Sequence, residues 1–226
     1  MIERLIPVVI GYFCGSIPTG YLYAKARGVD IRKEGSGNIG MTNSMRTLGV
    51  KAGVVTLIGD LGKAVVAVLI AWLIFGNRNP EILPLIKLYA GFGAVLGHMF
   101  SFAMHFNGGK GIATTTGVMV VLCPFELPLA VSMFLVVAII TKYVSLGSLV
   151  GVLLFFVQAL VFGELGFFAP LDRPHLIEFY VICGVITALS VIRHRENIKR
   201  LIKGTENKFT LKNKKNLQQK EEENSK

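Results

Sequence analysis

Long apolar stretches alternate with short polar segments along most of the chain. A helix needs about 20 apolar residues to cross the hydrocarbon core of a bilayer, and fewer where the helix is short or the bilayer thins. Stretches of about this length occupy residues 5–24, 53–75, 85–106, 144–162 and 176–192. The pattern therefore predicts an all-α, polytopic integral membrane protein.

The apolar stretch from residue 112 to residue 141 admits two interpretations. Prolines interrupt it at residues 124–128, where an unbroken helix is disfavoured. Two spans would each be short, about 20 Å at a rise of roughly 1.5 Å per residue. They would nevertheless place Lys110, Lys142 and the basic C-terminal part on the same side as the basic loop 25–51. Because Lys and Arg prefer the cytoplasmic side, we predict seven transmembrane helices, with the N-terminus outside and the C-terminus cytoplasmic.

The composition agrees with a membrane protein. Apolar residues make up 52% of the chain, charged residues 17%, and the mean hydropathy is +0.58. The net charge of +10 does not indicate nucleic acid, because eleven of the 24 basic residues follow Val191 and most others lie between apolar runs. The expected partner of this charge is membrane lipid. The polar, mixed charge of the C-terminal end divides the chain into a membrane domain, residues 1–208, and a disordered tail, residues 209–226.

Cysteines and the first apolar run add little chemistry. Cys14, Cys123 and Cys183 lie in apolar contexts without metal-ligand spacing, which favours buried, unpaired thiols. The first apolar run is preceded by Glu3 and lacks a small-residue cleavage site, so it is expected to be a retained span. No spacing of ligand residues indicates a metal, and no organic cofactor is expected.

The most conspicuous polar stretch is residues 35–46, in the loop after the first span. Its glycines match G-x-G-x-x-G, but the dinucleotide fingerprint also requires a preceding strand and a βαβ unit. Glycine-rich turns let successive backbone N–H groups form a concavity for an anion. Further donors and a permanent charge come from Ser36, Asn38, Thr42, Asn43 and Arg46. The stretch therefore predicts a phosphate site.

Three more polar segments fall on the same side of the membrane in this topology: residues 107–116, 141–148 and 193–206. In the first of them, glycines surround Lys110 as in half a P-loop, without the required first glycine and the final Ser or Thr. The segment is either a phosphate-binding turn before a helix N-terminus or a tight re-entry turn with a snorkelling lysine. The convergence of all these polar segments at one membrane surface suggests a phosphorylated substrate next to lipid.

Other polar side chains have structural alternatives. His194 and Asn197 share a helix face and could hold the hydroxyls of one ligand, or mark a basic helix end at the membrane surface. His98, within an apolar span, is by itself more often a structural group. Asp60 and Lys63 would lie inside the second span, where charges are costly unless paired, so a structural pair is expected.

Two common signatures of acyl transfer and hydrolysis are absent from the sequence. There is no G-x-S-x-G nucleophile elbow. None of the four histidines has an aspartate five positions later, so the His-x4-Asp pattern of the common glycerolipid acyltransferases is missing.

The polar clusters together resemble one family, the bacterial membrane glycerol-3-phosphate acyltransferases that use acyl phosphate (PlsY). The similar motifs are GSGNIGMTNSMR at residues 35–46, a stretch from Gly97-His98 to Gly108-Gly109-Lys110-Gly111-Ile112-Ala113-Thr114, and RHRENIKRLIKGTE at residues 193–206. The Tyr-Val-Ser-Leu-x-Ser segment is matched at residues 143–148. Two small departures, Met41 in place of Ala and Ser101 in place of Pro, remove no polar group.

The resemblance implies roles for individual residues. The phosphate of glycerol 3-phosphate would be held by Ser36, Arg46, Lys110 and Ser148. Its hydroxyls would be oriented by His194 and Asn197. These two residues form the catalytic set together with Ser36, Arg46 and Lys110, whereas Ser148 only binds substrate. The acyl phosphate and the developing oxyanion would be lined by Gly37, Asn38, Gly40, Thr42 and Asn43. The second motif adds the substrate-binding residues His98, Gly108 and Gly109, and Glu206 would be structural.

The resemblance also implies an activity. A fatty acyl group would pass from acyl phosphate to the 1-hydroxyl of sn-glycerol 3-phosphate, giving lysophosphatidic acid and phosphate as the first acylation of phospholipid synthesis. The enzyme would act as a monomer in the bacterial cell (inner) membrane, with its active site at the cytoplasmic face. The base would be either His194 or the donor's own phosphate. A transporter for a phosphorylated metabolite is the alternative, but it should gather its polar groups near the bilayer midplane.

Overall fold

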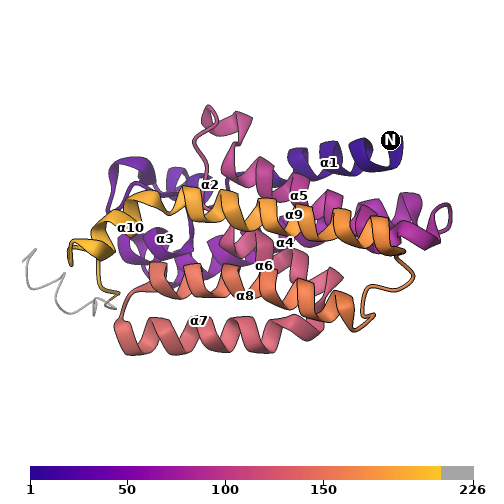
Figure 1. The fold of residues 1–226 in the computed structure, drawn as a ribbon. Coiled ribbons are helices and arrows are strands. Elements are labelled where there is room, and N and C mark those ends of the chain that lie inside the picture. Colours follow the sequence, from indigo (N-terminus) through magenta and orange to yellow (C-terminus); the bar gives the residue numbers. More distant parts are fainter. Residues whose placement is uncertain (210–226) are drawn as a thin grey trace, which may run out of the picture.

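The computed structural model describes residues 1–209, which form helices joined by short loops (Figure 1). Within this range there are ten α-helices: α1 (Ile2–Gly15), α2 (Thr19–Lys25), α3 (Met41–Leu48), α4 (Val50–Phe75), α5 (Leu83–Met99), α6 (Ile112–Leu122), α7 (Leu127–Thr141), α8 (Val144–Glu164), α9 (Arg173–Arg193) and α10 (Arg195–Ile202). The all-α prediction is confirmed. The tail predicted at residues 209–226 lies outside the described residues, apart from Phe209.

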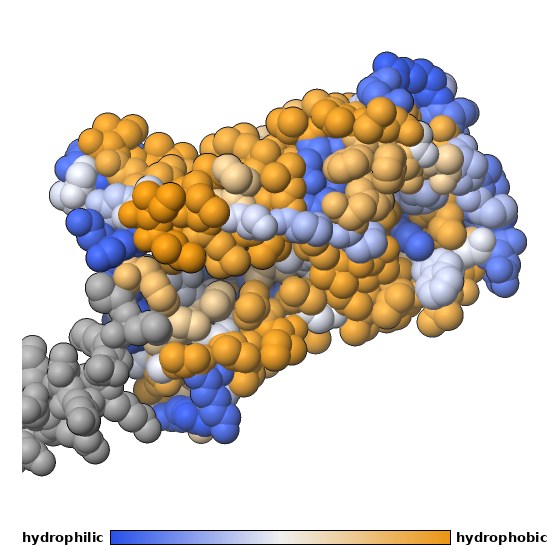
Figure 2. All heavy atoms as spheres, turned by 90° about the horizontal axis from the view of Figure 1, so that it is seen from below, coloured by the Kyte–Doolittle hydropathy of each residue, from blue (hydrophilic) through white to orange (hydrophobic). Residues whose placement is uncertain are grey.

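The membrane character of the fold is also confirmed. Counting α1 and α2 as one interrupted span, six helices of the described chain are long and apolar enough to cross a membrane, and the apolar helix α6 is shorter. Figure 2 shows hydrophobic side chains over most of the middle of one face and hydrophilic ones near its ends. The seventh span and the orientation of the termini stay predictions.

Prolines set two of the helix boundaries. The chain breaks between α6 and α7 at a 3-10 turn, Pro124–Glu126, as predicted from the prolines. The first apolar run breaks before Pro18, and the carbonyl of Ile17 accepts a hydrogen bond from Lys63 Nζ at 2.9 Å. A backbone group freed inside the membrane thus finds a side-chain partner.

One predicted span is shorter than expected. The third apolar stretch was expected to continue to residue 106, but α5 ends at Met99. The following residues turn back, because the N–H groups of Gly108 and Gly109 donate to the carbonyls of Met99 and His98, each at 3.0 Å. This return of the chain fixes the start of the 107–111 turn against the end of α5.

Helices α1 and α5 pack almost backbone to backbone. A Cβ placed on Gly11 would lie 2.0 Å from the carbonyl oxygen of Ala90, and one on Gly97 would lie 2.2 Å from that of Tyr12. Small residues permit such close approach of helices in membranes, where van der Waals packing drives association. Only glycine fits at these two positions.

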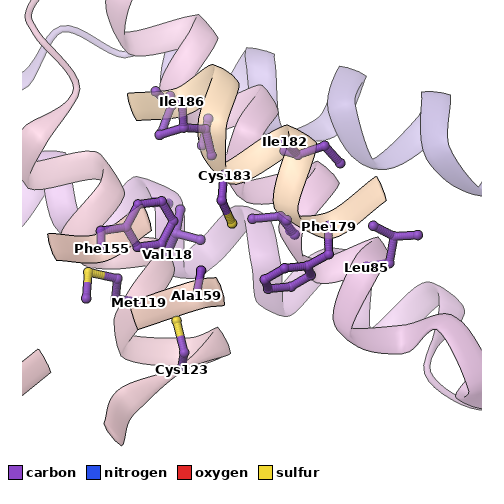
Figure 3. Packing of buried hydrophobic residues seen from close by; sticks show 14 of the residues in the cluster. Leu85, Val118, Met119, Cys123, Phe155, Ala159, Phe179, Ile182, Cys183 and Ile186 are labelled. Carbon is purple, nitrogen blue, oxygen red and sulfur yellow. The ribbon is translucent and has the colours of Figure 1, made fainter. Parts of the chain in front are cut away.

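The main apolar core lies between α4, α5, α6, α8 and α9 (Figure 3). Phe155, Phe179 and Ile186 are each 0–1% exposed. Helix α7 lies at the edge of the bundle beside α8 (Figure 1), and Ala130 is its single buried residue in the range 127–141. Helix α7 therefore borders the lipid along most of its surface.

The polar segments lie together at one end of the bundle. Helices α2, α3 and α10 cluster there, whereas the N-terminus lies at the opposite end (Figure 1). The chain after α10 returns to the same end, where the N–H of Phe209 donates to the carbonyl of Lys142 at 2.8 Å. The predicted convergence of the polar segments on one side is thus reproduced.

Candidate active site

A cavity of about 440 Å³ opens among α3, α4, α6, α7, α8 and the end of the chain after α10. Its polar part is lined by residues from all four polar segments of the sequence. The residues predicted for the site that line it are Ser36, Asn38, Gly40, Thr42, Asn43, Arg46, His98, Lys110, Ser148, His194, Asn197 and Glu206. Gly37, Gly108 and Gly109 do not line the cavity, although they lie beside residues that do.

The loop before α3 is built around the side chain of Asn43. Its Oδ1 accepts from the N–H of Ser36 at 2.9 Å, and its Nδ2 donates to the carbonyls of Glu34 (2.9 Å) and Ile31 (3.3 Å). Both amide donors are therefore occupied within the protein. Gly37 makes the turn at a positive φ of 71°, where side chains are strained. Asn43 and Gly37 shape the loop that presents its neighbours to the cavity.

Two helix N-termini border the cavity. Gly40 precedes α3, and Asn38 Oδ1 accepts from its N–H at 2.8 Å. Gly111 precedes α6, whose first residues Ile112 and Ala113 also line the cavity. The partial positive charge of a helix N-terminus favours anions. A helix does begin directly after the turn that carries Lys110, while the phosphate-binding role of this turn stays a prediction.

A chain of hydrogen bonds joins the second and third motifs. Lys110 Nζ donates to Asn197 Oδ1, and Asn197 Nδ2 donates to Glu206 Oε1 at 2.8 Å. Glu206 also accepts from Ser145 Oγ at 2.9 Å and from Arg200 Nε at 2.7 Å. Three donors thus converge on one carboxylate, and Lys110 is linked to it through Asn197. Its arrangement agrees with the structural role expected for Glu206.

Cationic groups dominate the polar end of the cavity. Burial, together with the nearby charges of Arg200, Arg193 and Arg46, lowers the pKa of Lys110 to about 8, although Glu206 opposes the shift. Positive charges this close together repel one another, and a bound anion reduces this repulsion. This polar end is therefore suited to bind an anion.

His194 is held in one tautomer. It is 2% exposed, and its Nδ1 lies 2.7 Å from the carbonyl oxygen of Ser190. A carbonyl can only accept, so Nδ1 carries the proton and Nε2 is left as an acceptor. Burial and the charge of Lys110 lower the pKa of His194 to about 4. The imidazole is thus neutral at pH 7 and suited to accept a hydrogen bond from a hydroxyl.

A buried polar cluster supports the 107–111 turn from inside the membrane. Lys63 Nζ lies 2.9 Å from Asp60 Oδ1 and 2.8 Å from His98 Nδ1. The other side of the His98 ring packs on the turn, since a Cβ on Gly109 would stand 2.1 Å from His98 Nε2. The predicted pairing of Asp60 with Lys63 is confirmed. The pair also anchors His98, and through it the turn that carries Lys110.

Arg193 fixes the same turn from the opposite side. Its Nε donates to the carbonyl of Gly109 at 3.1 Å, and its Nη2 donates to that of Gly108 at 2.6 Å. The N–H groups of both glycines are bonded to the end of α5, so neither points at the cavity. These glycines position Lys110 through close packing.

The cavity also has an apolar part, which we call the apolar arm. It runs between α4, α6, α7 and α8 and is lined by Leu57, Leu61, Met119, Ala130, Val131, Phe134, Leu135, Gly151, Val152 and Phe155. From Ser148 to Phe155 the helix rises about 10 Å at 1.5 Å per residue. Val131 and Leu135 are 40% and 46% exposed, so the α7 side of the arm borders the lipid.

Some lining residues were not predicted. Thr115 is 3% exposed and has no hydrogen-bond partner within the described chain, and Arg200, Ser145 and Asp60 also line the cavity. Thr115 follows Lys110 by five residues, so its position in the first turn of the next helix was the available signal. The apolar arm had no sequence signal, because its residues resemble any other membrane-helix residues.

Fold and cavity together define an integral membrane protein with a site for a molecule that is both anionic and lipid-like. The chain matches the glycerol-3-phosphate acyltransferase family over residues 5–204. It is 41% identical to the glycerol-3-phosphate acyltransferases of Trichlorobacter lovleyi and Geobacter sulfurreducens, over 92% of this chain and 99% of each relative.

Solved structures agree with this match. The chain resembles the crystal structure of PlsY, an integral membrane glycerol 3-phosphate acyltransferase, in its glycerol 3-phosphate form, with a TM-score of 0.78 and 36% identity over 92% of this chain and 96% of that one. The lysophosphatidic acid form gives a TM-score of 0.77 and 35% identity over the same shares. The chain belongs to the PlsY family of membrane glycerol-3-phosphate acyltransferases.

Proposed function

We propose that the protein transfers a fatty acyl group from acyl phosphate to the 1-hydroxyl of sn-glycerol 3-phosphate, giving lysophosphatidic acid and phosphate. The observation that carries the proposal is the continuity of the cavity. Its basic end suits two phosphorylated groups, and its apolar arm suits a fatty chain. Such a cavity serves a reaction that joins a water-soluble anion to a lipid, the first acylation of phospholipid synthesis.

The acceptor occupies the basic end in this proposal. Ser36, Arg46, Lys110 and Ser148 bind its phosphate, as expected from the family motifs. His194 Nε2 accepts a hydrogen bond from a glycerol hydroxyl, which is supported by the fixed tautomer of the ring. Asn197 holds the ammonium of Lys110 in place and adds polar contact to the glycerol.

The donor lies with its chain in the apolar arm and its acyl phosphate near the start of α3. There the N-terminus of the helix, with Gly40 and the side chains of Asn38 and Thr42, faces the carbonyl oxygen on which charge develops. Preorganised donors of this kind act where charge appears in the transition state. Asn43 and Gly37 keep the loop in the required shape.

The chemical step needs little acid–base help from the protein. The acceptor oxygen attacks the acyl carbon, the bond from that carbon to the phosphate oxygen breaks, and the hydroxyl proton passes to the departing phosphate. A buried imidazole with a pKa of about 4 is a weak base at neutral pH. We therefore assign the proton to the donor's own phosphate and the hydrogen bond to His194. The protein contributes alignment and charge stabilisation.

Replacing His194 with alanine tests this assignment. We expect kcat to fall less than tenfold and the KM for glycerol 3-phosphate to rise about tenfold or more, because a ground-state hydrogen bond is lost. Steady-state kinetics with saturating acyl phosphate measures both constants. A loss of several decades in kcat at unchanged KM would assign the base to His194 instead.

The same proposal includes the topology. Seven spans result when α6 is counted as a short span. The basic loops then lie on the same side of the membrane as the polar end of the cavity, and the N-terminus lies on the other side. The positive-inside tendency places the active site at the cytoplasmic face of a bacterial cell membrane. One chain supplies both parts of the cavity, which supports a functional monomer. Labelling of the variants Arg27→Cys and Gly166→Cys in intact cells, with the three native cysteines replaced, tests the orientation. Only the cysteine at position 166 should react with an impermeant reagent.

The activity itself is tested with the purified protein, palmitoyl phosphate and glycerol 3-phosphate. Phosphate and lysophosphatidate should appear in equal amounts, and palmitoyl-CoA or an acyl carrier protein thioester should give neither. The Lys110→Met variant is the matched control. Uptake of glycerol 3-phosphate into liposomes without acyl transfer would contradict the proposal and support the transporter alternative.

A further inference from the structure

The apolar arm ends at a wall formed by three buried side chains. Met119 of α6, Ala130 of α7 and Phe155 of α8 are 3%, 6% and 1% exposed, and they are the lining residues farthest from the polar end along these helices, together with the more exposed Val131. We call these three the end wall. One turn beyond it, Cys123 and Ala159 belong to the closed core and do not line the cavity. Figure 3 shows Phe155 and Met119 close together, with Ala159 and Cys123 beside them.

We propose that the end wall determines which acyl chain length the enzyme prefers. The inference rests on the proposed function, because it takes the apolar arm as the place of the fatty chain. A chain that stops at the wall fills the arm completely. To stay within the arm, a longer chain has to displace packed side chains, and a shorter one leaves an unfilled space. Both are unfavourable in a close-packed interior.

The region beyond the wall is a poor place for further methylenes. Gln158 follows Phe155 on α8 and donates from Nε2 to the carbonyl of Glu126 at 2.9 Å. Glu126 is 0% exposed, and within residues 1–209 neither of its carboxyl oxygens has a hydrogen-bond partner. A chain end pushed past Phe155 toward this pair would place methylenes, which cannot form hydrogen bonds, against buried polar groups. The polar pair therefore reinforces the limit that the end wall sets.

Two substitutions should move the preference in opposite directions. Phe155→Ala removes the ring from the wall and should raise the ratio of kcat/KM for stearoyl over myristoyl phosphate about tenfold. Ala130→Leu fills the end of the arm and should lower that ratio about tenfold, in line with the usual effect of one or two methylenes in an apolar pocket. The ratio is taken within one variant, so a reduced amount of folded protein does not affect it. Lauroyl and palmitoyl phosphates complete the series.

Phe156→Ala is the matched control. Phe156 is the next residue of α8 but does not line the cavity; it lies against Gly184 of α9, whose Cβ would be 3.4 Å from its ring. This variant loses the same volume from the same helix and should keep the wild-type ratio. An unchanged ratio in both end-wall variants would overturn the proposal, because the chain would then leave the arm past α7 into the bilayer.

Binding of lysophosphatidates with the same four chain lengths separates this inference from the choice of donor. Thermal stability of the purified protein reports this binding without any acyl transfer. Opposite shifts of the preferred chain in Phe155→Ala and Ala130→Leu support the end wall even if acyl phosphate is not the donor. Equal binding of all four chains by every variant would overturn it even if transfer from acyl phosphate is demonstrated.

Discussion

Lys110→Met is expected to lower kcat/KM for glycerol 3-phosphate by about a thousandfold. The ammonium lies at the basic end of the cavity and is hydrogen-bonded to Asn197. In the proposed complex this ammonium pairs with the phosphate of glycerol 3-phosphate. Removing one partner of a buried, hydrogen-bonded charge pair costs about 3–5 kcal/mol, and each 1.36 kcal/mol corresponds to a factor of ten. The loss should fall mainly on steps that involve the acceptor. Steady-state kinetics with glycerol 3-phosphate as the varied substrate measures it.

Lys199→Met is the control for this change. Lys199 lies on α10 at the same end of the molecule, pairs with Glu196, has a 66% exposed side chain and does not line the cavity. An exposed pair contributes about 0–1 kcal/mol, so kcat/KM should stay within a fewfold of wild type. Similar losses in the two variants would show that general surface charge, and not the site of Lys110, binds the acceptor.

The pH dependence of the wild type provides a second measurement for Lys110. The pKa of Lys110 is about 8. A bound phosphate raises this pKa, so the protonated form of Lys110 binds the phosphate more tightly. Affinity for glycerol 3-phosphate should therefore be constant just below pH 8 and fall above it by up to tenfold per pH unit. Because Arg keeps its charge throughout this range, the Lys110→Arg variant should lose this decline. A wild-type profile that stays flat up to pH 10 would exclude Lys110 from acceptor binding.

Asp60→Asn is expected to destabilise the folded protein by about 3–5 kcal/mol, because it leaves a buried ammonium without its counter-charge. Lys63 is 7% exposed, Asp60 is 3% exposed, and their charged atoms are 2.9 Å apart within the helix bundle. The remaining partners of Lys63 are the Ile17 carbonyl and the His98 ring. Both are neutral acceptors, so they cannot replace the charge of the carboxylate. Denaturant unfolding in mixed micelles, followed by circular dichroism, measures the change.

Restoring neutrality should restore most of the lost stability. The double variant Asp60→Asn, Lys63→Met removes the unpaired charge, so its free energy of unfolding should lie nearer to wild type than that of Asp60→Asn alone. Glu164→Gln is the control, because Glu164 pairs with Arg173 at a site where both side chains are more than half exposed. Additive losses in the double variant would contradict a coupled pair.

The helices could be predicted from the sequence because bilayer thickness imposes a minimum apolar length. The proline-rich interruption at residues 124–128 and the distribution of basic residues then divided the ambiguous stretch correctly into two helices. The early end of α5 could not be predicted. Residues 100–106 are apolar enough to continue a span, and their departure depends on hydrogen bonds from Gly108 and Gly109 that form only in the folded chain.

Most residues that line the polar end of the cavity were predictable, but the contacts that each of them makes were not. The motifs identified twelve residues that line the cavity. They could not distinguish Ser36, which lines it, from Gly108 and Gly109, whose backbone groups are occupied elsewhere. Local sequence also gave Asp60 and Lys63 as a pair on one helix face without showing that His98 completes the cluster. Such links depend on packing between distant segments.

The close contact of α1 with α5 has a consequence for the tolerance of the chain to mutation. Helix α1, described in full, contributes no residue to the cavity, yet Gly97 touches its backbone and directly precedes His98. Any side chain added at Gly11 or Gly97 must separate the two helices and carry His98 with it. In a scan of substitutions, changes in α1, which contacts neither substrate, should therefore abolish function as strongly as changes in the residues that bind the substrates.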